Sequence, residues 1–191
     1  MAERDRVAER QPVARVRLER VSARRQHEFL AAVRRSRGLH ARWVAPPASA
    51  PAYRRYLAGL RRPTRAAFFI VRRDTGELAG VVNISEIVRG NFQSAYLGYY
   101  ALVPHHRRGY MTEGLRLVVV ELFGALGLHR LEANIQPGNV ASRRLVRRLG
   151  FRREGFSLRY LKIAGRWSDH ERWAITREEW AGPARPRRRS S

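Results

Sequence analysis

The sequence contains no cysteine, a single lysine and no long apolar run, and each absence narrows what the chain can do. Without cysteine there are no disulfides, no thiolate metal ligands and no cysteine nucleophile. No apolar stretch approaches the roughly 20 residues that span a bilayer, and the charged opening lacks the apolar centre of a secretion signal. The six histidines show no metal-ligand spacing. We therefore expect a cytoplasmic protein that holds no metal and contacts no membrane.

Negative charge is also scarce, because 16 acidic residues face 39 basic ones and leave a net charge of +23. Nearly all the cations are arginine, since Lys162 is the only lysine. Two interpretations stay open. The excess can reflect a general coding bias toward arginine, or it can mark weak association with RNA, the ribosome or another acidic surface.

The length of 191 residues and the 44% hydrophobic content suit one domain with one core. The polar residues 1–12 predict a flexible segment, and residues 13–180 predict the folded domain. Residues 181–191 predict a basic, disordered tail, because concentrated runs of like charge are usually solvated. The oligomeric state, monomer or homodimer, is left open.

Apolar periodicity predicts an α/β domain of the α+β type. Turn residues and helix caps place the elements in the order βααβββαβαββ, in which a meander precedes a parallel crossover. The expected strands span residues 13–18, 67–71, 78–84, 94–102, 128–135, 156–163 and 167–175. The expected helices span 23–37, ended by Gly38, then a helix capped by Ser49, then 111–126, stopped by Gly127, and 139–149. This order implies a single mixed, mostly antiparallel, twisted sheet with helices on both faces.

A basic loop, His105 to Met111, joins the strand that ends at Val103 to a long helix. Backbone amides at a helix start bind phosphate, and Gly109 would allow close approach of the backbone. The loop alone is weak evidence, because Arg107 and Arg108 could simply be solvated.

A second segment, Asn139 to Phe151, follows at the spacing typical of one family. The loop resembles the Gln/Arg-x-x-Gly-x-Gly/Ala signature of the GNAT acetyltransferase superfamily, and this segment resembles its Asn-x-x-Ser helix followed by Leu-Gly-Phe. His106 stands where Gln or Arg is usual, and Met111 where Gly or Ala is usual. Within the superfamily, the chain from Val13 to Trp180 resembles the RimJ/RimL-type ribosomal-protein N-terminal alanine acetyltransferases, and is nearest to RimJ. The segments that carry this likeness are 83–85, 88–90, 96–99, 109–113, 129–134 and 165–170.

The resemblance implies acetyl-CoA as cosubstrate and assigns its contacts. The pantetheine arm would lie where two strands splay, pairing with main-chain groups near Leu102 and Val103. The pyrophosphate would rest on amides of residues 107–111 and on Thr112, with Arg107 or Arg108 adding charge. The complete set of expected coenzyme contacts is Leu102, Val103, Arg107, Arg108, Gly109, Tyr110, Met111, Thr112, Asn134, Asn139 and Ser142.

Direct attack of a neutral amine on the thioester needs one group to accept a proton and one to donate a proton. Ser142 is the expected acid; the alternative is a hydroxyl that bonds the first turn of its own helix. Many relatives have a tyrosine three residues later, where this chain has Leu145, so Tyr160 would substitute if its strand folds over the site. Glu132 is the first candidate for the base. Glu86 and Asp169 are the next candidates for the base. His129 and His170 are interpreted as structural.

The acceptor implied by the resemblance is the N-terminal alanine of a ribosomal protein, or another protein N-terminus. Its expected contacts are Glu86, Asn134 and Asp169. A cationic N-terminus would need acidic groups such as Glu86, Glu132 or Glu171 in the channel. Without them, the acceptor would be a small neutral amine. Two alternatives stay open: an acetyltransferase for an amino acid, polyamine or antibiotic, and a ribosome assembly factor that uses the fold as a scaffold.

Overall fold

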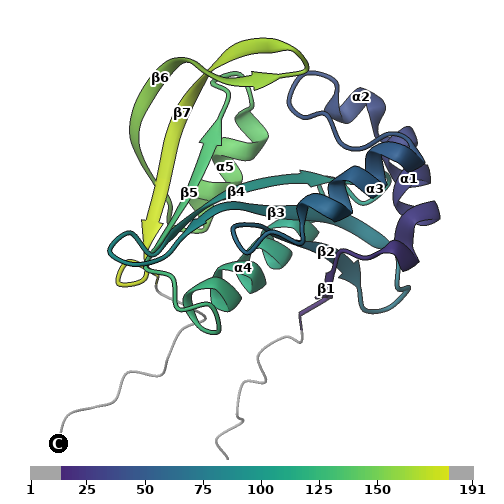
Figure 1. The fold of residues 1–191 in the computed structure, drawn as a ribbon, viewed down its shortest axis with the longest axis horizontal. Coiled ribbons are helices and arrows are strands. Elements are labelled where there is room, and N and C mark those ends of the chain that lie inside the picture. The colour runs from purple at the N-terminus through teal and green to yellow at the C-terminus, as the bar shows by residue number, and fades with distance from the viewer. Residues whose placement is uncertain (1–13, 181–191) are drawn as a thin grey trace, which may run out of the picture.

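A computed structural model describes residues 14–180 of the chain as one seven-stranded sheet with helices on both faces (Figure 1). The strand order is β1-β2-β3-β4-β5-β7-β6, and β4–β5 is the parallel pair among antiparallel ones. The strands are β1 (Val16–Arg20), β2 (Ala66–Arg72), β3 (Leu78–Val88), β4 (Ser94–Ala101), β5 (Arg130–Ile135), β6 (Arg152–Ile163) and β7 (Arg166–Thr176). The helices are α1 (Gln26–Arg35), α2 (Arg37–His40), α3 (Ala50–Gly59), α4 (Tyr110–Phe123) and α5 (Val140–Arg148), with a 3-10 turn at Ala23–Arg25. The predicted fold class is confirmed.

Two helix ends differ from the prediction. The first predicted helix breaks at Ser36, whose hydroxyl donates to the Ala32 carbonyl at 2.7 Å, and Gly38 lies inside the short α2 instead of ending a helix. A serine hydroxyl that bonds its own helix competes with the regular backbone ladder. The helix α4 ends at Phe123 and not at Leu126, because Gly124 leaves the helical conformation three residues before Gly127. The predicted cap at Ser49 is confirmed by its bond from the Ala52 amide.

Two apolar clusters cover the two faces of the sheet. Side chains of α4 and α5 pack on one face with Phe68 and Ile70, whereas α1 and α3 pack on the other with Phe69 and Val71. This alternation along β2 explains why the strand is apolar at nearly every position. The helix α4 approaches β2 closely because Gly114 has no side chain, and a Cβ there would overlap Ile70.

The sheet opens between β4 and β5. The two strands pair at Ser94–Arg130, Ala95–Leu131 and Tyr96–Glu132, after which β4 continues to Ala101 beside an unpaired edge (Figure 1). The expected splay is therefore present, and it begins at Leu97.

The predicted flexible segment 1–12 and basic tail 181–191 lie outside the described residues. Among residues 14–180, no helix is both long and apolar enough to cross a membrane.

Candidate functional site

A cavity of about 720 Å³ occupies the gap where β4 and β5 diverge. The end of β4, the basic loop, the start of α4, the end of β5 and the start of α5 form its walls. Trp43 and Val44, which follow α2, and Leu161, Ile163 and His170 of the β6–β7 hairpin complete it. The cavity is therefore lined by residues from both faces of the sheet.

Backbone groups of β4 face the cavity at alternate residues. The amide of Leu102 donates to Ala79 on β3 at 2.9 Å, so even-numbered residues of β4 turn their amides and carbonyls toward β3. The odd-numbered Leu97, Tyr99 and Ala101 then turn theirs toward the gap. The Ala101 carbonyl already accepts a bond from His40 Nε2 at 2.8 Å.

The predicted pantetheine partners, Leu102 and Val103, do not fit this pattern. The Leu102 amide is committed to β3, and the Val103 amide donates to Ser36 Oγ at 3.0 Å. An extended ligand in the gap would instead meet the main chain of Tyr99 and the amide of Ala101. The alternation along β4 could be predicted from the sequence. Whether the odd-numbered or the even-numbered residues turn their backbone groups toward the gap depends on the register with β3.

The basic loop reaches the start of α4 through two residues with left-handed backbone, Arg107 at φ 61° and Gly109 at φ 85°. Gly109 is the N-cap, and its carbonyl accepts from Thr112 and Glu113 at 3.0 and 3.1 Å. The earlier amides of the first turn have no partner within the helix, which is the arrangement that holds an anion.

The loop residues divide between the cavity and the interior. Arg107, Gly109, Met111 and Thr112 line the cavity as expected. Arg108 and Tyr110 are not among its lining residues, because the Arg108 carbonyl accepts from Arg15 at 3.1 Å and Tyr110 is buried beneath that same guanidinium. Arg15 also pairs with Glu113, so the one carboxylate in the first turn of α4 is neutralised.

Three arginines line the cavity, namely Arg107, Arg144 and Arg148, and none of the described lining residues is aspartate or glutamate. A cavity with this charge suits an anionic ligand with several phosphates. The gap, the free helix start and these arginines therefore fit the coenzyme that the sequence predicts. Among residues 14–180, no three His, Cys, Asp or Glu side chains are grouped so as to hold a metal ion.

The hydroxyls of Tyr99 and Ser142 meet across the gap at 2.6 Å. Asn139 caps α5 by accepting from the Ser142 amide at 3.1 Å, so the Ser142 hydroxyl is turned toward Tyr99 and does not bond its own first turn. Burial raises the pKa of Tyr99 well above its usual range, so the phenol stays protonated. The sequence interpretation selected Ser142 and missed Tyr99, because 43 residues separate them.

The carboxylates predicted for the base and for the acceptor contacts lie outside the cavity lining. Glu132 Oε1 accepts from Arg130 Nε at 2.9 Å, and Asp169 accepts from the Arg159 amide at 2.7 Å. Glu86 is also absent from the cavity lining, and Glu171 is buried in an ion pair with Arg143. The structure does not bring these four groups together, and none of them lines the cavity.

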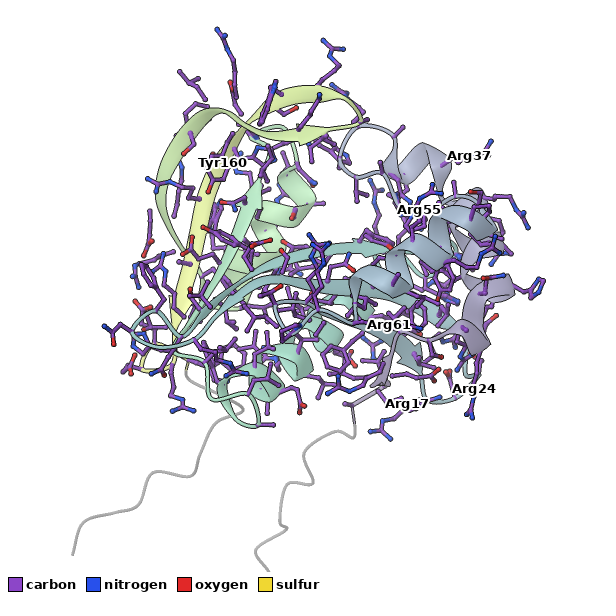
Figure 2. The ribbon with its side chains drawn as sticks, viewed as in Figure 1. Arg17, Arg24, Arg37, Arg55, Arg61 and Tyr160 are labelled. Atoms are coloured by element: carbon purple, nitrogen blue, oxygen red, sulfur yellow. The ribbon has the colours of Figure 1, made fainter. Side chains whose placement is uncertain are left out.

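Tyr160 lies on β6 (Figure 2) and is not among the residues that line the cavity. Its ring packs 6.3 Å from that of His170, centroid to centroid. Its hydroxyl faces Tyr96, whose pKa rises to about 12, mainly through burial and then through this contact. Tyr160 therefore contacts two residues that line the cavity, but it makes no hydrogen bond to Tyr99 or Ser142.

Asn134 does line the cavity, as predicted for a ligand contact. Its Oδ1 atom is buried and has no hydrogen-bond partner among the described residues. An unpaired buried acceptor is costly, so a donor from an ordered water or from a bound molecule would satisfy this atom.

A model of the acetyltransferase (GNAT) domain family matches residues 15–152, which is most of the chain. The chain belongs to the GNAT acetyltransferase family. The match begins just before β1 and covers the gap, the basic loop and α5, whereas the β6–β7 hairpin that completes the cavity follows the matched residues.

Curated relatives support the same assignment. The chain is 38% identical over 120 residues to the probable N-acetyltransferase YjcK of Bacillus subtilis, covering 63% of this chain and 66% of that one. It is 39% identical over 107 residues to the [ribosomal protein uS5]-alanine N-acetyltransferase of Escherichia coli, covering 56% and 55%. The aligned region thus spans less than two thirds of each relative's length.

Solved structures share the GNAT fold. Mycobacterium smegmatis RimJ in complex with CoA-disulfide has a TM-score of 0.79 at 28% identity, covering 86% of this chain and 83% of that one. Vibrio cholerae spermidine N-acetyltransferase, in complex with CoA and spermine, has a TM-score of 0.75 at 18% identity, covering 88% and 99%. The second likeness concerns the fold alone.

Proposed function

We propose that the chain transfers the acetyl group of acetyl-CoA to the α-amine of a protein N-terminus, most specifically an N-terminal alanine of a ribosomal protein. The observation that carries acetyl transfer is the opening between β4 and β5, which ends in a basic helix start and is bridged by the Tyr99–Ser142 pair. The named activity of the Escherichia coli relative supports the choice of acceptor.

The absence of carboxylates from the described cavity lining bears on the acceptor. We expected acidic groups for a cationic N-terminus, and this expectation is not met. An α-amine has a pKa of about 7.7–8.0, so roughly a third is neutral at pH 7.5, whereas a lysine-like amine with a pKa near 10.4 is only about 0.1% neutral. A cavity without carboxylates therefore favours an amine that is neutral near pH 7.5, either a protein α-amine or a small neutral amine, over a polyamine.

We assign the residues around the cavity to two tasks. Thr112, the first-turn amides of α4 and the three cavity arginines hold the coenzyme's phosphates, and the main chain of Tyr99 and Ala101 holds its extended arm. The Tyr99–Ser142 pair supplies the proton that the departing sulfur needs. Direct attack by the bound amine requires no covalent bond to the protein.

Acceptor choice is tested with peptides and with cells. An alanine-starting peptide should be acetylated at its α-amine, while the same peptide with a blocked N-terminus and spermidine should react at least tenfold more slowly. N-terminal peptides from cells that lack the gene should lose acetylation on an alanine-starting protein. Faster reaction of spermidine would replace the proposed acceptor with a polyamine.

A second candidate function, association with ribosomal RNA, is favoured by the helices α1–α3. Between residues 23 and 65 the sequence has eleven arginines and one carboxylate, Glu28, which pairs with Arg25. The other ten are exposed and make no ion pair with any described residue; four of them, Arg24, Arg37, Arg55 and Arg61, are labelled on this side in Figure 2. The ten are Arg24, Arg34, Arg35, Arg37, Arg42, Arg54, Arg55, Arg61, Arg62 and Arg65.

Binding to RNA through these helices should weaken with salt, with a logarithmic slope that falls by about 0.7 for each lost phosphate contact on a single strand. The double change of Arg54 and Arg55 to serine should reduce both affinity and slope. The matched change of Arg159 and Arg166, which are exposed on the β6–β7 hairpin, should have no such effect. Equal losses in both variants would indicate nonspecific attraction by net charge.

A further inference from the structure

His170 of β7 has one ring nitrogen committed and one open. Its Nδ1 lies 2.8 Å from the Ser168 carbonyl oxygen, which can only accept, so Nδ1 carries the hydrogen. Nε2 of the neutral ring then holds a lone pair. The residue is only 2% exposed, and it is one of the residues that line the cavity.

Two of the other cavity histidines, His40 and His105, have Nε2 in a contact, and His106 belongs to the basic loop. His40 Nε2 donates to the Ala101 carbonyl, and its Nδ1 is buried without a partner. His105 Nε2 pairs with Glu77 at 3.3 Å. The Nδ1 atoms of both His105 and His106 are buried, and both residues belong to the basic loop where the phosphates are expected. His170 is therefore the cavity histidine outside the basic loop whose Nε2 bonds no described residue.

Strand register makes His170 a diagonal neighbour of Asn134. Asn134 stands opposite Arg172 on β7, and His170 is two residues from Arg172, so alternation puts the side chains of His170 and Asn134 on the same face of the sheet. Glu171, between them, points to the other face and pairs with Arg143 of α5. His170 and Asn134 share the face opposite the cluster of α4 and α5, the face on which α1 and α3 pack against β2 to β4, whereas Tyr99 packs with the cluster of α4 and α5.

We propose that His170 Nε2 is the general base of the reaction and that Asn134 Oδ1 holds an N–H of the acceptor amine beside it. This inference rests on the proposed function, and neither residue is assigned this role by the named activities of the relatives. The unpaired Oδ1 of Asn134 supplies the missing acceptor, and the fixed tautomer of His170 supplies the lone pair.

The proton balance follows from the two faces. As the amine nitrogen bonds to the acetyl carbon, His170 Nε2 takes one amine proton on the α1–α3 side. The carbon–sulfur bond breaks, and the Tyr99–Ser142 pair gives a proton to sulfur on the α4–α5 side. His170 returns its proton to water, and the hydroxyl pair recovers one, so the net products are the amide and the free thiol.

The surroundings of His170 keep its ring neutral. Burial lowers its pKa, opposed by the Ser168 carbonyl and by Asp169 on the same strand. The other titratable or charged groups near it are Tyr160 of β6, Arg172 of β7, and Arg144 and His40 across the cavity. A lowered pKa means that the base form is present at pH 7 and is lost as the pH falls.

The test compares His170→Gln with His129→Gln, a histidine outside the cavity that pairs with Glu178 at 3.0 Å. Single-turnover acetylation of the alanine peptide should slow by about 10²- to 10⁴-fold in His170→Gln, the usual contribution of a general base, and stay unchanged in His129→Gln. Both variants should retain the rise in melting temperature caused by acetyl-CoA. Added imidazole should restore part of the rate of His170→Ala, which a purely structural role would not allow.

A readout independent of activity is the nitrogen NMR spectrum of the histidine rings. It should show His170 neutral and protonated on Nδ1 at pH 7.5. An Nε2-protonated or fully protonated ring, or a wild-type rate in His170→Gln, would overturn the role of His170. If the wild type itself acetylates no amine, the proposed function fails and not merely this assignment.

Discussion

The Tyr99→Phe substitution removes a single hydroxyl from the pair that bridges the gap. That hydroxyl lies 2.6 Å from Ser142 Oγ, and its ring stays in the cluster packed against α4 and α5. The loss of one such hydrogen bond costs about 0.5–1.5 kcal/mol of stability. If the pair protonates the leaving sulfur, the acetyl-transfer rate falls far more, by about 10²- to 10⁴-fold, or roughly 3–5 kcal/mol of barrier.

Tyr53→Phe is the matched control. Tyr53 is also buried and donates to the Ser22 carbonyl at 2.8 Å, but it does not line the cavity. Both variants should lose similar stability in urea unfolding, and only Tyr99→Phe should lose rate. The comparison thereby separates damage to the fold from damage to the chemistry.

The assay is a single-turnover measurement of thiol release with saturating acetyl-CoA and an alanine-starting peptide. Because burial raises the pKa of Tyr99, its phenol stays protonated at neutral and mildly basic pH, and no loss of rate between pH 7 and 9 should trace to its ionisation. A rate for Tyr99→Phe within about threefold of Tyr53→Phe would refute the reasoning and leave Ser142 or water as the proton source.

Three further outcomes are expected. Gly109→Glu should abolish the rise in melting temperature caused by acetyl-CoA, which corresponds to about 2.7 kcal/mol of stabilisation at 100 times Kd. The control Gly90→Glu has a similar positive φ but lies away from the cavity, so it should retain the rise. Equal behaviour of the two variants would remove the loop from the coenzyme site. Gly114→Ala should lower the unfolding free energy by up to about 2 kcal/mol, because overpacking against Ile70 costs about 1–3 kcal/mol and the higher helix propensity of alanine returns about 1 kcal/mol. The control Gly59→Ala should be neutral or stabilising, because no atom lies closer than 3.6 Å to the added Cβ. A Gly114→Ala variant as stable as the wild type would contradict the close approach of α4. Finally, urea unfolding should show a lower free energy of unfolding at pH 5.5 than at pH 7.5. Burial lowers the pKa of three histidines in the folded state, so the unfolded chain binds more protons below about pH 6.5. A free energy of unfolding that rises on acidification would be inconsistent with their burial. These histidines are His40, His105 and His170.

Much of the fold was predictable because its signals are local. Turn residues separate the meander strands β2, β3 and β4, and the cap at Ser49 and the glycine before α4 mark helix starts. The two wrong helix ends have local causes of another kind, a hydroxyl at Ser36 and an unusual backbone at Gly124, which periodicity does not register.

More of the residues expected to contact the coenzyme line the cavity than of those expected to contact the acceptor. The loop and the start of α5 carry sequence motifs, whereas the Tyr99–Ser142 contact depends on how β4 and α5 meet in space. One signal against Glu132 was available in the sequence: Arg130 lies two residues earlier, hence on the same face of a strand, where an ion pair forms. The tautomer of His170 follows from a carbonyl in its own strand, which no side-chain pattern reveals.

The most direct test of the account is a crystal structure of the chain with bound CoA. The extended arm should lie between β4 and β5, bonded to the main chain of Tyr99 and Ala101, with its sulfur near the Tyr99 and Ser142 hydroxyls and its pyrophosphate on the amides that open α4. Coenzyme bound instead on the arginines of α1–α3, with the gap filled by side chains, would contradict the account.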